Sequence, residues 1–155
     1  MQPRMKSPVF TLPGTREAIL NLVKAAERGG VPRATLELVE VRVGQINGCA
    51  ICVDMHTRAL RKLGESDMRI STVATWRETP YFTDAERAAL ALAEAVTRLN
   101  DRADAVPDEV WEEASKHFAE PALGQLLIAI AVANLWNRLN VSTRQVTGDW
   151  VAQYV

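Results

Sequence analysis

The sequence lacks most of the features that direct a protein to membranes, nucleic acids or the secretory route. Its net charge is −1 and no block of like charge stands out, which argues against nucleic acid or an anionic membrane as the main partner. Residues 1–20 contain no apolar segment typical of a signal peptide. The longest apolar run, residues 122–136, is interrupted by Gln125 and Asn134 and is too short to span a bilayer. We therefore expect a cytoplasmic protein.

The sequence also has no convincing strand pattern, no glycine-rich phosphate loop and no internal repeat. Its 155 residues, 48% of them apolar and 24% charged, are enough for one domain with a sizeable core. We predict a single all-α domain over residues 1–155. Residues 1–13 carry three prolines and no periodic pattern, so we expect an extended N-terminal arm there, packed on a neighbouring subunit.

Apolar periodicity and capping residues predict a bundle of about six or seven helices. Ser66 is a candidate N-cap, and Thr83 with Glu86 three residues later forms a capping-box pattern. Residues 141–155 are expected to form a tail. The expected helices begin near residues 15, 32, 49, 66, 83, 108 and 121.

Cysteine is scarce, and both cysteines stand in one short stretch, residues 47–56. Asn47 and Gly48 are typical of a helix start, and the residues after them predict a helix to Gly64. On that helix Cys49, Cys52 and His56 fall within an arc of about 60°. The unpaired N–H groups and positive dipole end of a helix favour a thiolate, and by this argument Cys49, nearer the terminus, is the more acidic thiol.

The preceding helix, residues 32–46, is apolar over much of its circumference and is expected to be buried. Its polar strip consists of Glu37, Glu40 and Gly44, which lie within about 60° of one another by helical geometry. A carboxylate on such a helix is a candidate for proton transfer. The spacing of residues along this helix does not show which of the two carboxylates, Glu37 or Glu40, would transfer the proton.

Three interpretations of the cysteine helix compete. The first is dithiol redox catalysis, in which a thiolate attacks an oxidant and the second thiol closes a disulfide, with His56 shuttling protons. The second is a Zn²⁺ site formed by Cys49, Cys52 and His56, with His117 or a carboxylate as fourth ligand. The third is a pair of inert core thiols. A c-type haem is excluded because no histidine directly follows the second cysteine.

The combined pattern resembles a known family. Glu37, eleven residues, and then Cys49-x-x-Cys52-x-x-x-His56 is similar to the signature of the AhpD-like alkylhydroperoxidases, within the carboxymuconolactone decarboxylase superfamily. The string from Arg42 to Arg58 is close to the core wording of that family, and the tight resemblance covers residues 36–64. The family spacing selects Glu37 over Glu40.

The resemblance implies an all-helical fold with the CxxC pair at a helix N-terminus and assembly into trimers or hexamers. It implies hydroperoxide reduction through a Cys49–Cys52 disulfide without a cofactor, with Glu37 and His56 at the proton-relay positions. Cys52 corresponds to the peroxide-attacking thiol and Cys49 to the resolving one. The electrons would come from a dithiol donor, a lipoylated or thioredoxin-like protein.

The sequence departs from the best-known AhpD enzymes at Ile51, where they carry a histidine before the second cysteine. Those enzymes are also longer. The decarboxylase branch lacks the CxxC pair, so lactone decarboxylation is a poor match. A non-catalytic redox sensor, in which the disulfide changes the oligomer, is the alternative from another functional class. Two further polar residues, Asp54 and His117, are expected to be solvated.

Overall fold

The computed structural model describes residues 1–100 and 102–155 and is entirely helical over them. Seven α-helices and four short 3-10 helices (η) make up this part of the chain, and no strand occurs in it. The all-α prediction is therefore confirmed. The elements in chain order are η1 (Pro8–Phe10), α1 (Thr15–Ala26), η2 (Glu27–Gly29), α2 (Arg33–Asn47), α3 (Ala50–Lys62), α4 (Asp67–Ser71), η3 (Val73–Glu78), α5 (Asp84–Thr97), α6 (Asp108–His117), α7 (Glu120–Ser142) and η4 (Asp149–Tyr154).

Local sequence signals explain where several helices begin. The Thr83 hydroxyl accepts the N–H of Glu86, and the Glu86 carboxylate accepts the N–H of Thr83, which is the predicted capping box of α5. Ser66 caps α4 by accepting the N–H of Arg69. The helix predicted to begin at Ser66 is short, because α4 ends at Ser71 and the chain continues as η3.

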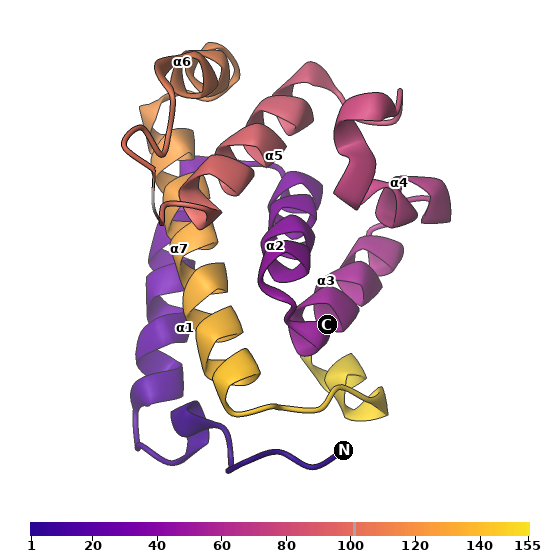
Figure 1. Ribbon diagram of the computed structural model, residues 1–155, viewed down its shortest axis with the longest axis vertical. Coiled ribbons are helices and arrows are strands. Elements are labelled where there is room, and N and C mark those ends of the chain that lie inside the picture. Colours follow the sequence, from indigo (N-terminus) through magenta and orange to yellow (C-terminus); the bar gives the residue numbers. More distant parts are fainter. Residues whose placement is uncertain (101) are drawn as a thin grey trace.

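Helix α2 occupies the middle of the bundle, between α3, α5 and α7 (Figure 1). Leu38 and Val41 face one apolar cluster, which contains Trp76 and Phe82. Val39 and Val43 face a second cluster, built with α5 and α7. A helix that packs on both sides needs apolar residues around most of its circumference, which accounts for the sequence pattern.

Helix α7 is longer than the apolar run that marked it in the sequence. It has 23 residues and a mean hydropathy of 1.3 over its most apolar window, so by length and composition it could cross a membrane. Half of that window is buried within the bundle. Core helices of globular proteins can have the same length and composition. Helix α7 packs against α1, α2 and α5, as a core helix does.

The N-terminal segment contacts the end of α7, and the C-terminal segment contacts α3. Residues 1–13 include the helix η1, so they are not extended throughout, and the Arg4 N–H donates to the Thr143 carbonyl of the same chain. The C-terminal residues form η4, which lies on α3 (Figure 1). Residues 143–155 are therefore a cover for α3 and not a free tail.

Candidate active site

The two cysteines form a disulfide at the head of α3. Gly48 has a φ of +69° and makes the turn between α2 and α3, while Cys49 itself is the N-cap of α3. Its Sγ accepts the N–H of Cys52 at 3.3 Å. The sequence assigned the helix start to Asn47 and Gly48, but these residues end α2. The prediction of a CxxC pair at a helix N-terminus is confirmed.

A cluster of one imidazole and two carboxylates, only partly accessible to solvent, connects α2 to α3. His56 Nδ1 lies 2.7 Å from Glu37 Oε2 and 3.2 Å from Glu40 Oε2. The Glu37 side chain is fully buried, and its other oxygen contacts the Arg33 guanidinium without hydrogen-bond geometry. The structure thus brings Glu37 to His56, as the family pattern implies, and adds Glu40 to the same nitrogen.

Charge and burial compete within this cluster. Burial alone would lower the pKa of His56, but the carboxylates of Glu40 and Glu37 outweigh it and hold the pKa above 6.5. Burial raises the pKa of Glu40, an effect that His56 partly offsets. An imidazole whose pKa is raised beside a carboxyl whose pKa is also raised can exchange a proton with it.

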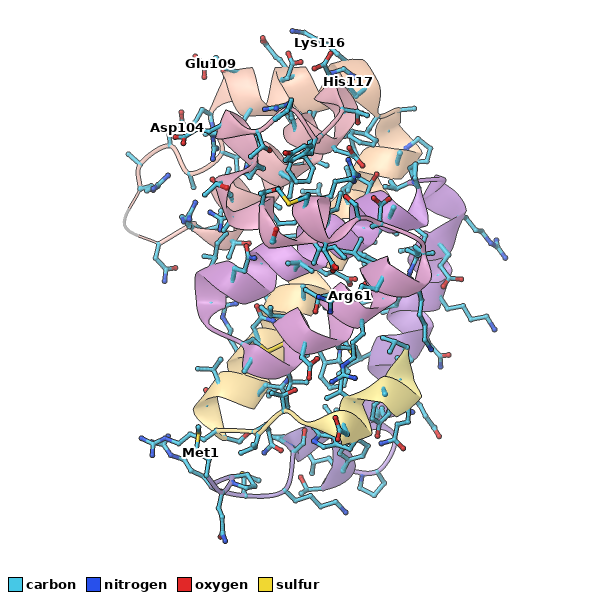
Figure 2. The ribbon with its side chains drawn as sticks, turned by 90° about the vertical axis from the view of Figure 1, so that its right-hand side faces the viewer. Met1, Arg61, Asp104, Glu109, Lys116 and His117 are labelled. Carbon is cyan, nitrogen blue, oxygen red and sulfur yellow. A yellow bond between two sulfur atoms is a disulfide. The ribbon has the colours of Figure 1, made fainter. Side chains whose placement is uncertain are left out.

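The zinc site considered from the sequence is not assembled in the described part of the chain. Cys49 and Cys52 are bonded to each other, and His56 Nδ1 faces the carboxylates. His117 pairs with Glu113 on α6, at the end of the molecule opposite Met1 (Figure 2). The three ligand atoms that do converge belong to Glu37, Glu40 and His56 and lie within 4.8 Å of one another.

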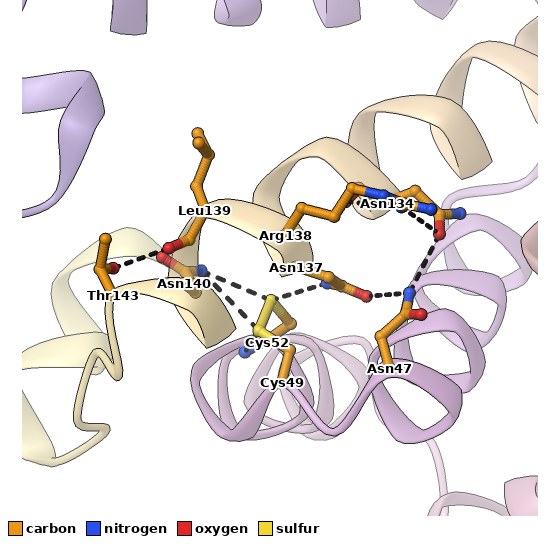
Figure 3. Close-up of a disulfide and its surroundings, with 9 residues drawn as sticks. All are labelled: Asn47, Cys49, Cys52, Asn134, Asn137, Arg138, Leu139, Asn140 and Thr143. Atoms are coloured by element: carbon orange, nitrogen blue, oxygen red, sulfur yellow. Dashed lines mark hydrogen bonds between the residues drawn. A yellow bond between two sulfur atoms is a disulfide. The ribbon is translucent and has the colours of Figure 1, made fainter.

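Asparagines of α7 face the disulfide (Figure 3). They are not among the site residues predicted from the sequence. Asn137 Nδ2 donates to Cys52 Sγ at 3.0 Å, and Asn140 Nδ2 lies 3.7 Å from both sulfurs. Asn137 is almost completely buried. Asparagines at 134, 137 and 140 in an otherwise apolar helix are the signal that could have pointed to them, because a buried amide needs a polar partner.

The C-terminal segment covers the other side of the disulfide. Val151 is fully buried in a small cluster with Cys49, Ile51 and Cys52. Asp54 is not simply solvated, because it binds Arg58 and the Thr147 hydroxyl, and these hydrogen bonds lower its pKa. Asp54 therefore attaches the C-terminal segment to α3.

A pocket of about 150 Å³ opens beside the first cysteine. The head of α3 forms one wall, including Cys49 and Ile51, and the end of α7 forms the other, including Asn140 and Arg144. Cys49, and not Cys52, is among the residues that line this pocket.

Comparison with known proteins decides the family. A model of the carboxymuconolactone decarboxylase family matches residues 13–95, which is more than half of the chain. The chain belongs to this family. It is 35% identical over 130 residues to the uncharacterised Bacillus subtilis protein YdfG, covering 84% of this chain and 87% of YdfG.

Solved structures agree on the fold of this carboxymuconolactone decarboxylase family member. The Agrobacterium tumefaciens protein ATU0492 superposes with a TM-score of 0.87 at 31% identity, over 95% of this chain and 99% of that one. ATU0492 is described as a protein of unknown function and a candidate AhpD antioxidant defence protein. The debrominase Bmp8 shares the fold at 20% identity, with a TM-score of 0.75 over 91% of this chain and 75% of Bmp8.

Together these findings support an AhpD-like member of the family. They favour an enzyme of the oxidoreductase or decarboxylase kind, and the CxxC pair fits a peroxidase-type role.

Proposed function

We propose that this protein is a thiol-dependent peroxidase that reduces hydroperoxides through a Cys49–Cys52 dithiol/disulfide cycle. The observation that carries the proposal is the disulfide at the head of α3, bordered by a pocket and flanked by hydrogen-bond donors. Inert core thiols need neither donors nor an adjoining pocket. Family membership and the likeness to ATU0492 support the same class of reaction.

The reaction needs both thiols. The Cys52 thiolate attacks the terminal oxygen of the hydroperoxide, the O–O bond breaks, and the alkoxide leaves as an alcohol after taking a proton. Cys52 is then a sulfenic acid. Cys49 attacks its sulfur, the disulfide forms, and the hydroxyl group leaves as water. Each turnover consumes one hydroperoxide and two thiols and yields one alcohol, one water and one disulfide.

The cluster of Glu37, Glu40 and His56 is proposed as the proton relay. His56 lies one helical turn after Cys52 on α3, so its ring can serve the leaving alkoxide and then recover a proton from the carboxylates. Glu37 holds Nδ1 at 2.7 Å and Glu40 holds it at 3.2 Å. The geometry supports Glu40 as a second member, beyond the pair that the family pattern selects.

Turnover requires a dithiol donor, and we assign this role to a lipoylated or thioredoxin-like protein. A dithiol reduces an intramolecular disulfide in two exchange steps without leaving a mixed disulfide behind. The pocket beside Cys49 provides the space for the entering sulfur. We place the protein in the cytoplasm.

The surface of α1 supports assembly into a trimer or hexamer. The helix packs against α7, which leaves Ile19 and Val23 partly buried, but Leu20 and Leu22 remain 42% and 48% exposed. An amphipathic helix that leaves large apolar side chains exposed suits a contact with another copy.

A thiol count on metal-free protein tests the function. One equivalent of cumene hydroperoxide should consume both thiols, and dihydrolipoamide should restore them and sustain turnover. Cys49→Ser and Cys52→Ser should each abolish turnover. Two thiols that stay unreacted, or full activity in either variant, would reject the cycle, while a single oxidation without turnover would identify a redox sensor.

A further inference from the structure

The amides near the disulfide form a hydrogen-bonded chain whose direction is fixed at one end (Figure 3). The Arg138 guanidinium has donors only, and it donates to Asn134 Oδ1 at 2.9 Å. The Asn134 amide nitrogen donates in turn to the Ile130 carbonyl at 2.9 Å. Asn134 therefore presents its oxygen, and not its nitrogen, to the neighbouring Asn47.

The next link orients Asn137. Asn47 Nδ2 donates to Asn134 Oδ1 at 3.0 Å and to Asn137 Oδ1 at 2.8 Å. Because the oxygen of Asn137 is turned toward Asn47, its amide nitrogen faces Cys52 Sγ at 3.0 Å. Reversing Asn137 would set two amide nitrogens against each other and an oxygen against sulfur, so the buried network permits one orientation.

We propose that Asn137, oriented by Asn47, stabilises the thiolate of Cys52 and makes Cys52 the sulfur that carries the negative charge. A disulfide sulfur is a weak acceptor, whereas a thiolate is an anion, and hydrogen bonds to charged acceptors are the stronger ones. The donor at 3.0 Å therefore stabilises the reduced protein more than the oxidised one. The inference deepens the proposed peroxidase function, but it concerns a state that exists without peroxide.

Each of the two sulfurs accepts one hydrogen bond that the other lacks. Asn140 is equidistant from them, at 3.7 Å. Cys49 Sγ receives the N–H of Cys52 at 3.3 Å, as helix caps do. Cys52 Sγ receives the shorter bond, from Asn137 at 3.0 Å. The donor from α7 thus opposes the preference of the helix terminus for Cys49.

The same polarity sets the direction of disulfide reduction. A donor thiolate entering the pocket attacks Cys49 Sγ, the bond between the two sulfurs breaks, and its electron pair remains on Cys52, where Asn137 holds the charge. The second thiol of the donor then attacks the mixed disulfide, displaces Cys49 as a thiolate and leaves as the oxidised donor. Cys52 is at that moment ready to attack a hydroperoxide.

The test measures the charge on one sulfur directly. In the Cys49→Ser background, ultraviolet thiolate absorbance against pH reports Cys52 alone. Adding Asn137→Ala should leave roughly tenfold less thiolate at any pH below the midpoint, the size expected for loss of a hydrogen bond to a charged group. Gln125→Ala is the matched control, because it removes another buried amide of α7, one that binds the Val31 N–H. It should not move the curve.

A second variant tests the orientation without touching either sulfur. Asn47→Asp replaces the donor with an acceptor, so Asn137 should turn its oxygen toward Cys52, and the thiolate curve should shift in the same direction as for Asn137→Ala. This variant also covers the case in which Asn137→Ala does not fold. If neither folded variant shifts the Cys52 curve beyond the Gln125→Ala control, the proposal is wrong.

Equilibration of the two-cysteine protein with a dithiol of known potential gives an independent readout. Asn137→Ala should favour the disulfide roughly tenfold, a potential about 30 mV lower. A shifted thiolate curve in a protein without peroxide turnover would reject the peroxidase and keep this inference. If the protein turns over peroxide but Asn137→Ala changes neither the thiolate curve nor the reduction potential, this inference is rejected and the peroxidase is kept.

Discussion

Gly44 of α2 lies directly against Cys52 of α3. A methyl group on Gly44 would sit 3.3 Å from Cβ of Cys52 and 3.2 Å from Cγ2 of Val53, closer than side chains normally pack. The absence of a side chain at this position lets α2, which carries Glu37 and Glu40, approach α3, which begins at the two cysteines.

Gly44→Ala should displace Cys52 from its donors and lower peroxide turnover. Overpacking of about 1–3 kcal/mol is opposed by a gain in helix propensity of about 1 kcal/mol, so we expect a net loss of about 0–2 kcal/mol in urea unfolding. Gly124→Ala on α7 is the matched control, because a methyl group there meets nothing within 4 Å. It should stabilise the protein by about 0.5–1 kcal/mol and leave turnover intact. If Gly44→Ala and Gly124→Ala had the same stability and the same turnover, the contact between Gly44 and Cys52 would have no role in either.

Glu40→Gln should lower the pKa of His56. Burial already favours the neutral imidazole, and the Glu40 carboxylate is the largest influence that opposes it. A raised pKa means that the stabilisation from His56 is fully present below the pKa of the unfolded chain and is lost as pH rises through the folded pKa. NMR titration of the imidazole signals measures the shift, with His117 in the same sample as the internal reference. A His56 midpoint that stays constant would remove Glu40 from the relay.

Glu94→Gln should destabilise the fold through a site remote from the chemistry. Although burial would raise its pKa, hydrogen bonds from Arg77, Trp76 and Arg42 lower the pKa of Glu94 to about 2. We expect a loss of about 2–3 kcal/mol at pH 7, less than for a fully buried pair because Arg77 is half exposed.

The lowered pKa of Glu94 gives this loss a defined pH dependence. The stabilisation is present above the ordinary carboxyl pKa of 4.5 and disappears as pH falls toward 2, so the gap between wild type and variant should close over that range. Urea unfolding at several pH values measures it. Glu113→Gln, at an exposed carboxylate, should cause no measurable change, and a gap that persists at pH 2 would contradict the assignment.

Val151→Ala should expose the disulfide. The side chain is fully buried against Cys49 and Cys52, so its loss opens space over the sulfurs and should speed reduction by dithiothreitol several-fold. Val73→Ala is the control, because Val73 is equally buried but belongs to the cluster around Trp76. Both variants should lose about 1–2 kcal/mol in urea unfolding. Only Val151→Ala should change the reduction rate, and equal rates would deny the C-terminal segment its covering role.

Leu22→Glu should prevent assembly without unfolding the chain. The substitution places a charge on the exposed apolar face of α1, where it costs nothing in a monomer but is desolvated in an interface. Light scattering after gel filtration should show a smaller species than the wild type. Leu63→Glu, at an equally exposed leucine outside α1, should leave the mass unchanged. A wild-type protein that is already monomeric would refute the predicted trimer or hexamer.

The sequence was informative where the signals are local. Capping residues such as Thr83 and Ser66 mark their helices because their hydrogen bonds stay within one turn. The CxxC spacing brought the two sulfurs together for the same reason, as the disulfide between Cys49 and Cys52 shows. Glu37 and Glu40 could not be separated, because residues three apart share a helix face and both reach His56.

Contacts between residues that lie far apart in the chain could not be predicted from the sequence. Asn137 meets Cys52 across 85 positions, and only the packing of α7 beside the head of α3 decides that contact. The covering role of Val151 has a similar origin, since a short segment with a 3-10 helix has no periodicity that identifies the surface it contacts.

Cys49 is both the cap of α3 and one half of the disulfide, so in the proposed cycle one sulfur atom would serve the fold and the reaction. In that cycle, every electron pair that enters or leaves the protein would change the end group of a helix. By thermodynamic linkage, whatever tightens the first turn of α3 alters the reduction potential, and the potential in turn alters how firmly that turn is held. A donor protein that binds at this turn would therefore deliver electrons and also shift the reduction potential of the disulfide that accepts them.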